Sequence, residues 1–328
     1  MNTTTIEWTD ASWNPVRGCT KVSKGCDHCY AEAISTHWNG SGSFDTVRLM
    51  PDVLDAPRRW RTPRRVFVNS MGDVLHEDIP DAYIARVLAV IAATPQHSYQ
   101  LLTKRHGRLR TLFNSQGALR LIDAADAAGD AATAQALYAA SWPLPNLWLG
   151  VSVEDQHWAN LRIPALLAAD ATVRFLSVEP LLGPVDLARW LGLEWMESFE
   201  GWGAELFTSL AGRVGIDGGL HWVIAGGESG PRARTPHPDW FRTLRDQCDA
   251  AKVPFFFKQW GQWSPDLDGR GRLVQVLPTG QILDQPRPEN FGEGLATMRR
   301  CASKRAAGRQ LDGRLHDAFP HHHPGGLS

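Results

Sequence analysis

Short apolar runs recur along the chain, and each ends in small or polar residues. Apolar runs bounded by turn residues are typical of strands that are buried on both faces of a parallel sheet. Seven segments have this pattern, at residues 12–16, 65–69, 99–103, 147–152, 173–177, 221–225 and 254–258. The pattern therefore predicts about six to seven parallel strands.

Between these runs lie stretches with apolar residues at helical spacing. They cover residues 81–94, 156–169 and 238–251, and the first stops at Pro95. Strands that alternate with helices of this length form βαβ units with right-handed crossovers. The predicted fold class is therefore α/β, a partial (β/α) barrel of the six to seven strands, with an open sheet as the alternative. In either arrangement ligands bind at the carboxyl ends of the strands.

Two segments interrupt the alternation. Residues 118–140 are rich in alanine and predict helix, and residues 190–219 contain three tryptophans and several glycines, which indicates an insertion. The alternation is lost after Trp263, so we predict a barrel domain over residues 1–263 and an irregular C-terminal extension over residues 264–328. The extension contains His321, His322 and His323, a run that could bind metal but is more typical of a solvated terminus.

Composition and charge narrow the class of protein. The chain has 328 residues, of which 43% are apolar, and a formal net charge of −1, so it lacks the overall positive charge of a typical nucleic-acid-binding protein. The first residues have neither the basic nor the apolar region of a secretory signal, and no apolar stretch approaches the ~18 residues that span a bilayer. An odd number of cysteines, three of them close together, argues against a disulfide scaffold. We therefore expect a cytoplasmic protein without membrane contact.

Three of the five cysteines, Cys19, Cys26 and Cys29, lie within eleven residues in a C-x6-C-x2-C pattern. Three thiolates are one ligand fewer than a closed tetrahedral zinc site or a fully ligated iron–sulfur cube needs. A metal group bound here would keep one position open for another molecule, which suits chemistry better than a purely structural role. A structural zinc knuckle with His28 as the fourth ligand is the alternative, although a side chain inside a tight C-x2-C turn seldom reaches the same metal.

Polar residues follow the predicted strands, starting with the second. The ones that we single out are Ser70, Asp73, Lys104, Ser152, Glu154, Glu179, Glu228 and Lys258. In a barrel the strand ends meet at one mouth, where such side chains could orient a polar ligand around the cysteines. The alternative for each residue is a structural role as a helix cap, in a turn or in a core ion pair. Polar residues at the ends of six predicted strands, all on one face of the predicted fold, favour a functional site.

Several blocks of the sequence resemble the phage Gp37/Gp68-like family, whose members have a three-cysteine motif. The blocks are Trp13-Asn14-Pro15, Gly18-Cys19, Cys26-x-x-Cys29-Tyr30-Ala31, Met71-Gly72-Asp73, Leu102-Thr103-Lys104-Arg105, and the segments 150–154, 177–184, 226–230 and 257–261. The cysteine triplet in a βα-repeat chain also resembles the radical S-adenosylmethionine (SAM) superfamily, and the layout of the strand-end motifs resembles that of the spore photoproduct lyases. The first cysteine gap departs from the usual C-x3-C-x2-C pattern of that superfamily.

This resemblance implies a radical SAM enzyme. Cys19, Cys26 and Cys29 would bind a [4Fe–4S] cluster, with the fourth iron open to SAM, and reductive cleavage of SAM would yield a 5′-deoxyadenosyl radical that abstracts a hydrogen atom from the substrate. An electron donor of the flavodoxin or ferredoxin type is also implied. The residues implied to bind SAM are Ser70, Asp73, Lys104 and Ser152. Those implied to act on the substrate side, as catalytic residues, are Glu154, Glu179, Glu228 and Lys258.

Two basic runs suggest that the substrate is a nucleic acid or a nucleotide. Residues 58–65 contain five arginines around Trp60, and residues 299–309 contain a second run. Such runs suit phosphate backbones, although a solvated arginine-rich loop is the alternative. Two further hypotheses stay open. In the first, the chain is a zinc-knuckle protein that binds nucleic acid. In the second, it is a SAM-binding scaffold for a partner protein, without radical chemistry. The family resemblance also implies a methyltransferase-like partner protein.

Overall fold

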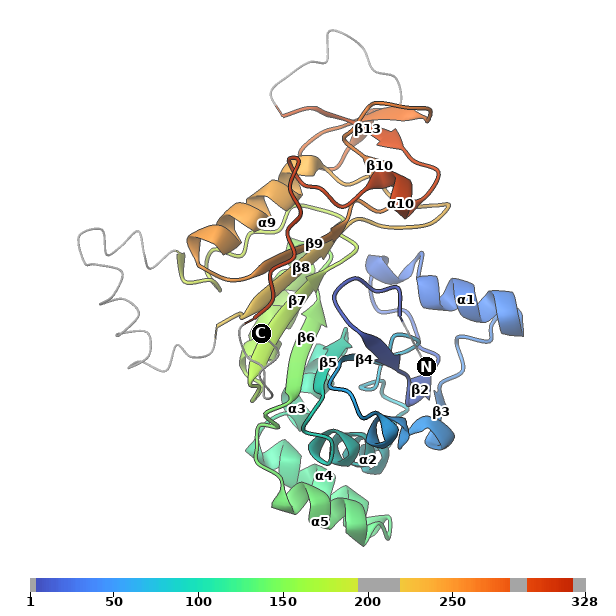
Figure 1. Cartoon of the computed structure of the whole chain (residues 1–328), viewed down its shortest axis with the longest axis vertical. Helices are drawn as coiled ribbons and strands as arrows, with labels where there is room; N and C mark the ends of the chain where they lie inside the picture. Colours follow the sequence, from blue (N-terminus) through green and yellow to red (C-terminus); the bar gives the residue numbers. More distant parts are fainter. Residues whose placement is uncertain (1–3, 194–218, 284–293, 321–328) are drawn as a thin grey trace, which may run out of the picture. The chain divides into compact units, whose positions relative to one another are not determined.

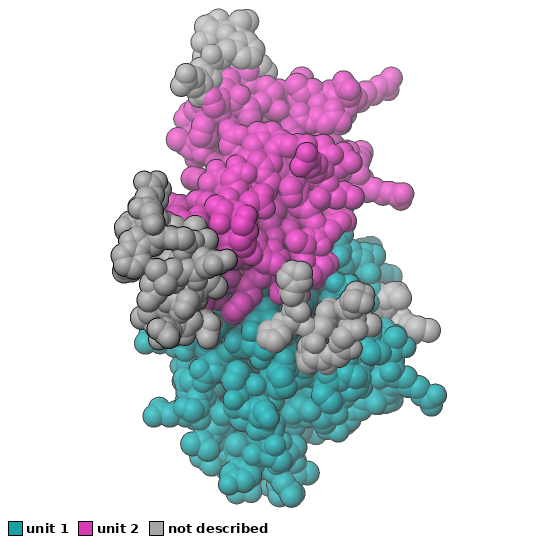
Figure 2. All heavy atoms as spheres, turned by 60° about the vertical axis from the view of Figure 1, so that its left-hand side comes forward, with its two compact units in different colours: residues 1–152, 164–175, 321–328 teal, residues 153–163, 176–320 magenta. Residues whose placement is uncertain are grey.

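The computed structural model describes residues 4–193, 219–283 and 294–320. The chain divides into two compact units (Figure 2). Unit 1 contains residues 1–152, 164–175 and 321–328, and unit 2 contains residues 153–163 and 176–320. Most of the insertion predicted at residues 190–219, and the predicted histidine run at residues 321–323, lie outside the described residues.

Seven strands form one sheet in the order β1-β4-β5-β6-β7-β8-β9 (Figure 1). Their bounds are Ala11–Trp13 (β1), Arg65–Val68 (β4), Ser98–Thr103 (β5), Leu147–Ser152 (β6), Val173–Val178 (β7), Trp222–Gly226 (β8) and Phe255–Gln259 (β9). Neighbours in the sheet follow one another along the chain, without the reversal of strand order that defines a doubly wound sheet. This sequential order is that of a (β/α) barrel. The predicted fold class, α/β of the partial-barrel type with about six to seven parallel strands, is confirmed.

The strands of unit 1 follow the apolar runs of the sequence. β5 pairs in parallel with β4 and with β6, and Tyr99 lies opposite Leu147 in the β5–β6 register. All six residues of β6 are buried, and five of the six residues of β5 are buried as well. Burial on both faces explains why β6 contains no polar side chain before its last residue, Ser152. In β5 the buried side-chain amide of Gln100 donates to the carbonyl of Trp8 at 3.2 Å.

The described residues of unit 1 contain a series of helices and one small strand pair. The α-helices are α1 (Tyr30–Asn39), α2 (Asp81–Ala92), α3 (His106–Leu112), α4 (Ser115–Ala127) and α5 (Ala131–Ala139). Three 3₁₀ helices, at Lys24–Cys26 (η1), Pro51–Val53 (η2) and Ala56–Arg59 (η3), and the antiparallel pair β2 (Val16–Arg17) and β3 (Arg48–Leu49) lie in the loops. The alanine-rich segment forms two helices because Gly129, with a φ of 76°, ends α4, and Asp130 caps α5 by accepting from the amide of Thr133.

Unit 2 contains β8 and β9, with helix α9 (Pro238–Ala250) between them in the chain. The apolar face of α9 includes Phe241, whose ring lies 5.1 Å from the rings of Phe257 and Trp260. A further helix, α6 (Gln156–Leu167), belongs to unit 2 up to residue 163 and to unit 1 from residue 164. No helix in the described part of the chain is long and apolar enough to cross a membrane.

The C-terminal extension is more regular than predicted. β10 (Trp263–Ser264), β13 (Ala296–Arg300), β11 (Leu273–Val276) and β12 (Ile282–Leu283) form a four-stranded antiparallel sheet in that order, and α10 (Lys304–Ala307) follows. Strands of two to five residues contain too few alternating positions to be recognised by their periodicity. β10 begins at Trp263, where the predicted barrel domain ends, but the division into domains stays a prediction.

Candidate functional site

The cysteine loop, residues 18–29, connects β2 to α1 in unit 1. Gly18 has a φ of 90°, and a Cβ atom at this position would lie 2.2 Å from the carbonyl oxygen of Thr46. Gly72, in the loop after β4, lies against Gly18, because the amide of Gly18 donates to the carbonyl of Met71 at 3.0 Å and a Cβ atom on Gly72 would lie 2.7 Å from the carbonyl oxygen of Gly18. Glycine is required at both positions, so the start of the cysteine loop packs directly against the loop after β4.

All three cysteines of the loop are free thiols and half-buried. The pKa of Cys19 is raised to about 12, first by burial and then by the charges of Asp73 and Cys26, while Arg105 opposes the increase. Burial also raises the pKa of the Cys29 thiol, and the charge of Cys26 raises it as well. Hydrogen bonds from the backbone amides of Ala31 and Glu32, at the start of α1, lower it. Cys26 therefore lies within electrostatic reach of both other thiols.

This donor set fits an iron–sulfur group in its chemistry. Three free thiols lie in one loop that is anchored at its first residue, and thiolates are the ligands that iron–sulfur clusters use. In the described ranges, no group of three His, Cys, Asp or Glu side chains is arranged so that it could hold a metal ion.

Asp73, predicted to bind SAM, follows β4 in the chain and is buried. Its carboxylate connects the loop after β4 to the end of β5. The Thr103 hydroxyl donates to both carboxylate oxygens at 2.8 Å, and the backbone amides of Lys104 and Leu75 each donate at 3.0 Å. Two of the predicted SAM-binding residues, Asp73 and Lys104, are thus brought together through a backbone hydrogen bond. The contact of Asp73 with SAM stays a prediction.

Ser70 lies between the cysteine loop and the segment after β1. Its hydroxyl donates to Oδ1 of Asn14 at 3.1 Å, and its carbonyl accepts from the hydroxyl of Tyr30 at 2.8 Å. Tyr30 is the residue after Cys29 and the first of α1, so the end of the cysteine loop is also bound to the loop after β4. Ser152 is the last residue of β6 and is buried. The four predicted SAM-binding residues therefore lie at the carboxyl ends of three neighbouring strands of unit 1.

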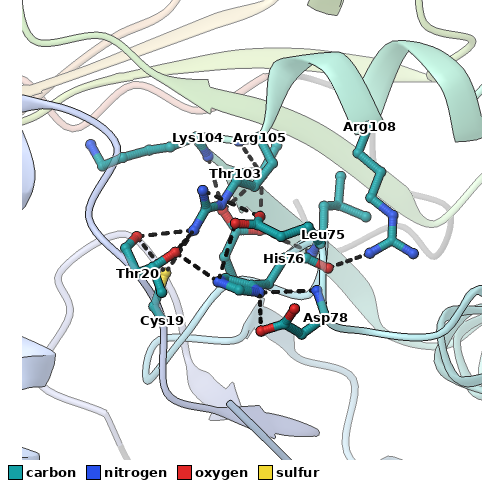
Figure 3. Close-up of polar contacts among 11 residues, drawn as sticks. Cys19, Thr20, Leu75, His76, Asp78, Thr103, Lys104, Arg105 and Arg108 are labelled. Carbon is teal, nitrogen blue, oxygen red and sulfur yellow. Dashed lines mark hydrogen bonds and ion pairs between the residues drawn. The ribbon is translucent and has the colours of Figure 1, made fainter. Parts of the chain in front are cut away.

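The side chain of Arg105 reaches the cysteine loop, which the sequence did not predict (Figure 3). Arg105 follows the end of β5 as the N-cap residue of α3. One terminal nitrogen, Nη2, lies 3.8 Å from Sγ of Cys19 and donates to the carbonyl oxygen and the hydroxyl of Thr20 at 2.9 and 2.8 Å. The only signal in the sequence was the block Leu102-Thr103-Lys104-Arg105, in which Lys104 was singled out instead.

In unit 2, Glu179 and Lys258 are brought together at the ends of β7 and β9. The ammonium of Lys258 lies 2.8 Å from both carboxylate oxygens of Glu179, and both side chains are largely buried. The amide nitrogen of Gln259 donates to Glu179 at 3.3 Å and to Ser229 at 2.9 Å. The carboxylate fixes the orientation of this amide, because it can only accept. The oxygen of Gln259 is buried and has no hydrogen-bond partner among the described residues.

The other two predicted acidic residues each bind an arginine. Glu228 is bound by Arg234, whose backbone amide and Nε donate to the same carboxylate oxygen at 2.8 and 2.9 Å. Glu154 accepts from Arg162 at 2.8 Å, and both side chains are completely buried. The structure therefore joins Glu179 to Lys258 but gives Glu154 and Glu228 partners of their own. Their roles toward a substrate stay predictions.

The fold and the loop define an α/β protein with three free thiols at the strand ends of unit 1. Residues 3–320 match the family described as "Protein of unknown function (DUF5131)", and the chain belongs to this family. The resemblance to the phage Gp37/Gp68-like family stays a prediction. No curated protein matched the sequence.

Solved structures of spore photoproduct lyase are similar to the chain. The lyase complexed with dinucleoside spore photoproduct is 13% identical, over 90% of this chain and 69% of that chain, with a TM-score of 0.39. A cysteine-to-serine mutant of the lyase matches with the same identity and coverage and a TM-score of 0.38. A tyrosine-to-phenylalanine mutant is 12% identical over 92% of this chain and 73% of that chain, with a TM-score of 0.37.

Proposed function

We propose that this chain is a radical SAM-type enzyme in which Cys19, Cys26 and Cys29 hold a [4Fe–4S] cluster. The cysteine loop carries this proposal, because its three free thiols lie in one glycine-anchored segment next to the buried guanidinium of Arg105. When bound, the reduced cluster supplies one electron that cleaves SAM into methionine and a 5′-deoxyadenosyl radical.

The residues at the strand ends of unit 1 would bind SAM. The ammonium of Lys104 would pair with the SAM carboxylate, a charge-assisted contact. Asp73 holds the backbone of Lys104 in place, so it would position that side chain even if the carboxylate itself did not touch SAM. Ser70 and Ser152 would contribute their hydroxyls from the carboxyl ends of β4 and β6, the two strands on either side of β5.

On the substrate side, we assign the pair Glu179 and Lys258 together with Gln259. Gln259 leaves a buried oxygen without a donor, so a substrate that offers an N–H or O–H group would satisfy it. Lys258 would offer its ammonium to an acceptor on the same molecule. Glu228 and Glu154, whose carboxylates are bound by arginines, would support the surrounding loops.

A nucleic acid or a nucleotide is the proposed substrate class. The run at residues 58–65 ends at Arg65, the first residue of β4, whereas Ser70 and Asp73 follow its last residue, so this run lies at the end of the strand away from the cysteine loop. In the run of unit 2, Lys304 and Arg305 of α10 are exposed and could contact a phosphate backbone. Binding to labelled DNA and RNA that weakens with rising salt and with Arg305→Gln would support this class. Equal affinity of parent and variant would count against this run.

Anaerobic reconstitution tests the proposed function. We expect about four irons per chain and, in the dithionite-reduced protein, a paramagnetic resonance signal that changes when SAM is added. Cys26→Ala should lose both. Cys248→Ala is the matched control, since Cys248 is a buried cysteine of α9 outside the cysteine loop, and it should keep both. A colourless protein that binds one zinc through the same cysteines would overturn the radical mechanism. The electron donor and the methyltransferase-like partner protein stay predictions.

A further inference from the structure

Arg105 places a positive charge inside unit 1, at the cysteine loop. Its side chain is 10% exposed. It extends from the start of α3 back to Cys19 and Thr20, which are labelled beside it in Figure 3. Among the described contacts of Arg105, the cysteine involved is Cys19. A buried guanidinium at 3.8 Å from a thiol is a costly arrangement unless an anion forms there.

The protein balances this charge only in part. Among the described residues, the ion-pair partner of Arg105 is Glu77, whose carboxylate lies 3.4 Å from Nη1 and whose side chain is 62% exposed. Water therefore screens the Glu77 charge, whereas the guanidinium lies in a region of low dielectric. The buried carboxylate of Asp73 also acts on Cys19, with a charge opposite to that of Arg105. The Nε of Arg105 is buried and has no hydrogen-bond partner among the described residues.

Thr20 fixes the guanidinium beside Cys19. The Thr20 hydroxyl accepts from Arg105 at 2.8 Å and lies 2.8 Å from Nε2 of His76. Nδ1 of His76 accepts from the backbone amide of Asp78 at 3.2 Å, so the ring proton lies on Nε2 and points to Thr20. Thr20 is thus held from two sides, and the position of the guanidinium relative to the thiol is set by this network.

We infer that Arg105 is a positioning residue that tunes the cluster electrostatically, raising the reduction potential of the [4Fe–4S] group bound to Cys19. This inference rests on the proposed function. Metal-bound cysteine is a thiolate, and reduction adds one further negative charge to the cluster. A fixed guanidinium beside a ligand sulfur favours the more negative, reduced state, as hydrogen bonds and charges around cluster sulfurs do in general.

The test compares the reconstituted parent with four variants at a fixed applied potential. The readout is the ratio of reduced to oxidised cluster, taken from the paramagnetic resonance signal. The iron content of each variant is measured alongside it. We expect Arg105→Gln to lower the ratio by about tenfold, which corresponds to a downward shift of about 59 mV for one electron. Arg105→Lys keeps the charge and should restore most of the ratio.

Arg108→Gln is the matched control. Arg108, one turn further along α3, donates to the carbonyls of His76 and Ile79 and to the carboxylate of Asp81. It therefore has a structural role and the same charge, and it touches the backbone of His76 but has no described contact with a cysteine. Arg108→Gln should change the ratio less than twofold. A purely structural role for Arg105 predicts equal shifts for Arg105→Gln and Arg108→Gln, and that result would overturn the inference.

A surface variant keeps the inference testable if Arg105→Gln does not fold. Glu77→Gln removes the exposed carboxylate that partly balances Arg105, and it should raise the ratio, opposite in sign to the loss of Arg105. An unchanged or lowered ratio in Glu77→Gln would contradict the inference. If the parent binds no iron, the proposed function itself fails, whereas a normal cluster with unshifted ratios in these variants overturns the role of Arg105 alone.

Discussion

Arg162 and Glu154 form an ion pair of 2.8 Å in which both side chains are completely buried. The guanidinium also lies 3.9 Å from the centroid of the Trp158 ring. Removing one member of such a pair leaves an uncompensated charge inside the protein, at a cost of roughly 3–5 kcal/mol. We expect Arg162→Met to lower the free energy of unfolding by about that amount, measured by urea denaturation at neutral pH.

The double variant Glu154→Gln/Arg162→Met is the control, because it removes both charges together. It should recover part of the stability that Arg162→Met loses. If Arg162→Met unfolds at the same urea concentration as the parent, the pair contributes no stability. Glu154 would then be a better candidate for the substrate-side role that the sequence suggested.

The strands buried on both faces could be predicted from the sequence, because an apolar run with polar ends has few other interpretations. The predicted segment 147–152 coincides with β6. The first predicted strand, at residues 12–16, is instead two strands, β1 and β2, separated by Asn14 and Pro15. Proline has no amide to donate, and the carbonyl of Pro15 accepts from the amide of Met50 instead of continuing the sheet.

The cysteine loop could also be predicted, since its spacing is local in the sequence. The partners of the candidate residues could not. Arg105 reaches Cys19 across 86 positions of the sequence, through the packing of the loops after β4 and β5. Glu154 and Glu179 look alike in the sequence, as acidic residues after apolar runs, yet Glu154 binds an arginine in the core and Glu179 binds Lys258. Such pairings depend on tertiary contacts that no short pattern records.

The contact between Thr103 and Asp73 predicts a second measurable effect. Thr103→Val keeps the shape of the side chain but removes the hydroxyl that donates to both carboxylate oxygens. A hydrogen bond to a charged group contributes about 1.5–3 kcal/mol, so the free energy of unfolding should fall by about that much. Amide exchange at Lys104 should also become faster, because its acceptor loses one of its anchors. Both quantities are measured on the metal-free protein.

Thr111→Val is the control for Thr103→Val. Its hydroxyl donates to the carbonyl of Gly107 within α3, at an exposed position. Surface substitutions of this kind usually change stability by less than about 0.5 kcal/mol. Equal losses in the two variants would mean that the Asp73 carboxylate does not depend on Thr103.

The close approach of Gly18 and Gly72 predicts that the cysteine loop responds to a single methyl group. Gly72→Ala would place a Cβ atom 2.7 Å from the carbonyl oxygen of Gly18. Overpacking of this kind costs about 1–3 kcal/mol, and here it would displace the start of the cysteine loop. We expect lower stability and a lower iron content after reconstitution. Gly107→Ala, with nothing within 4 Å of the added carbon, should be neutral or stabilising and keep its iron. Full iron loading of Gly72→Ala would show that the loop tolerates displacement.

The turn after Leu311 predicts a pH-dependent effect in unit 2. Hydrogen bonds from Arg242, and further ones from Arg245, lower the pKa of Asp312 to about 2 against the opposing effect of burial. A carboxyl with a depressed folded-state pKa stabilises the protein fully above its unfolded pKa of about 3.9, and this stabilisation is lost as the pH falls toward the folded value. Because Asp312 and Arg242 are 38% and 39% exposed, we expect no more than about 1 kcal/mol.

Asp312→Asn tests this linkage, since asparagine tolerates the φ of 52° at this position. The variant should be less stable than the parent at pH 7, and the difference should shrink between about pH 4 and pH 2, as measured by urea denaturation along a pH series. Asp246→Asn is the control, because Asp246 is 64% exposed and contacts Arg245 in the described residues. It should change the free energy of unfolding at pH 7 less than Asp312→Asn does. A stability difference for Asp312→Asn that stays constant down to pH 2 would mean that the charge of Asp312 is not what the arginines stabilise.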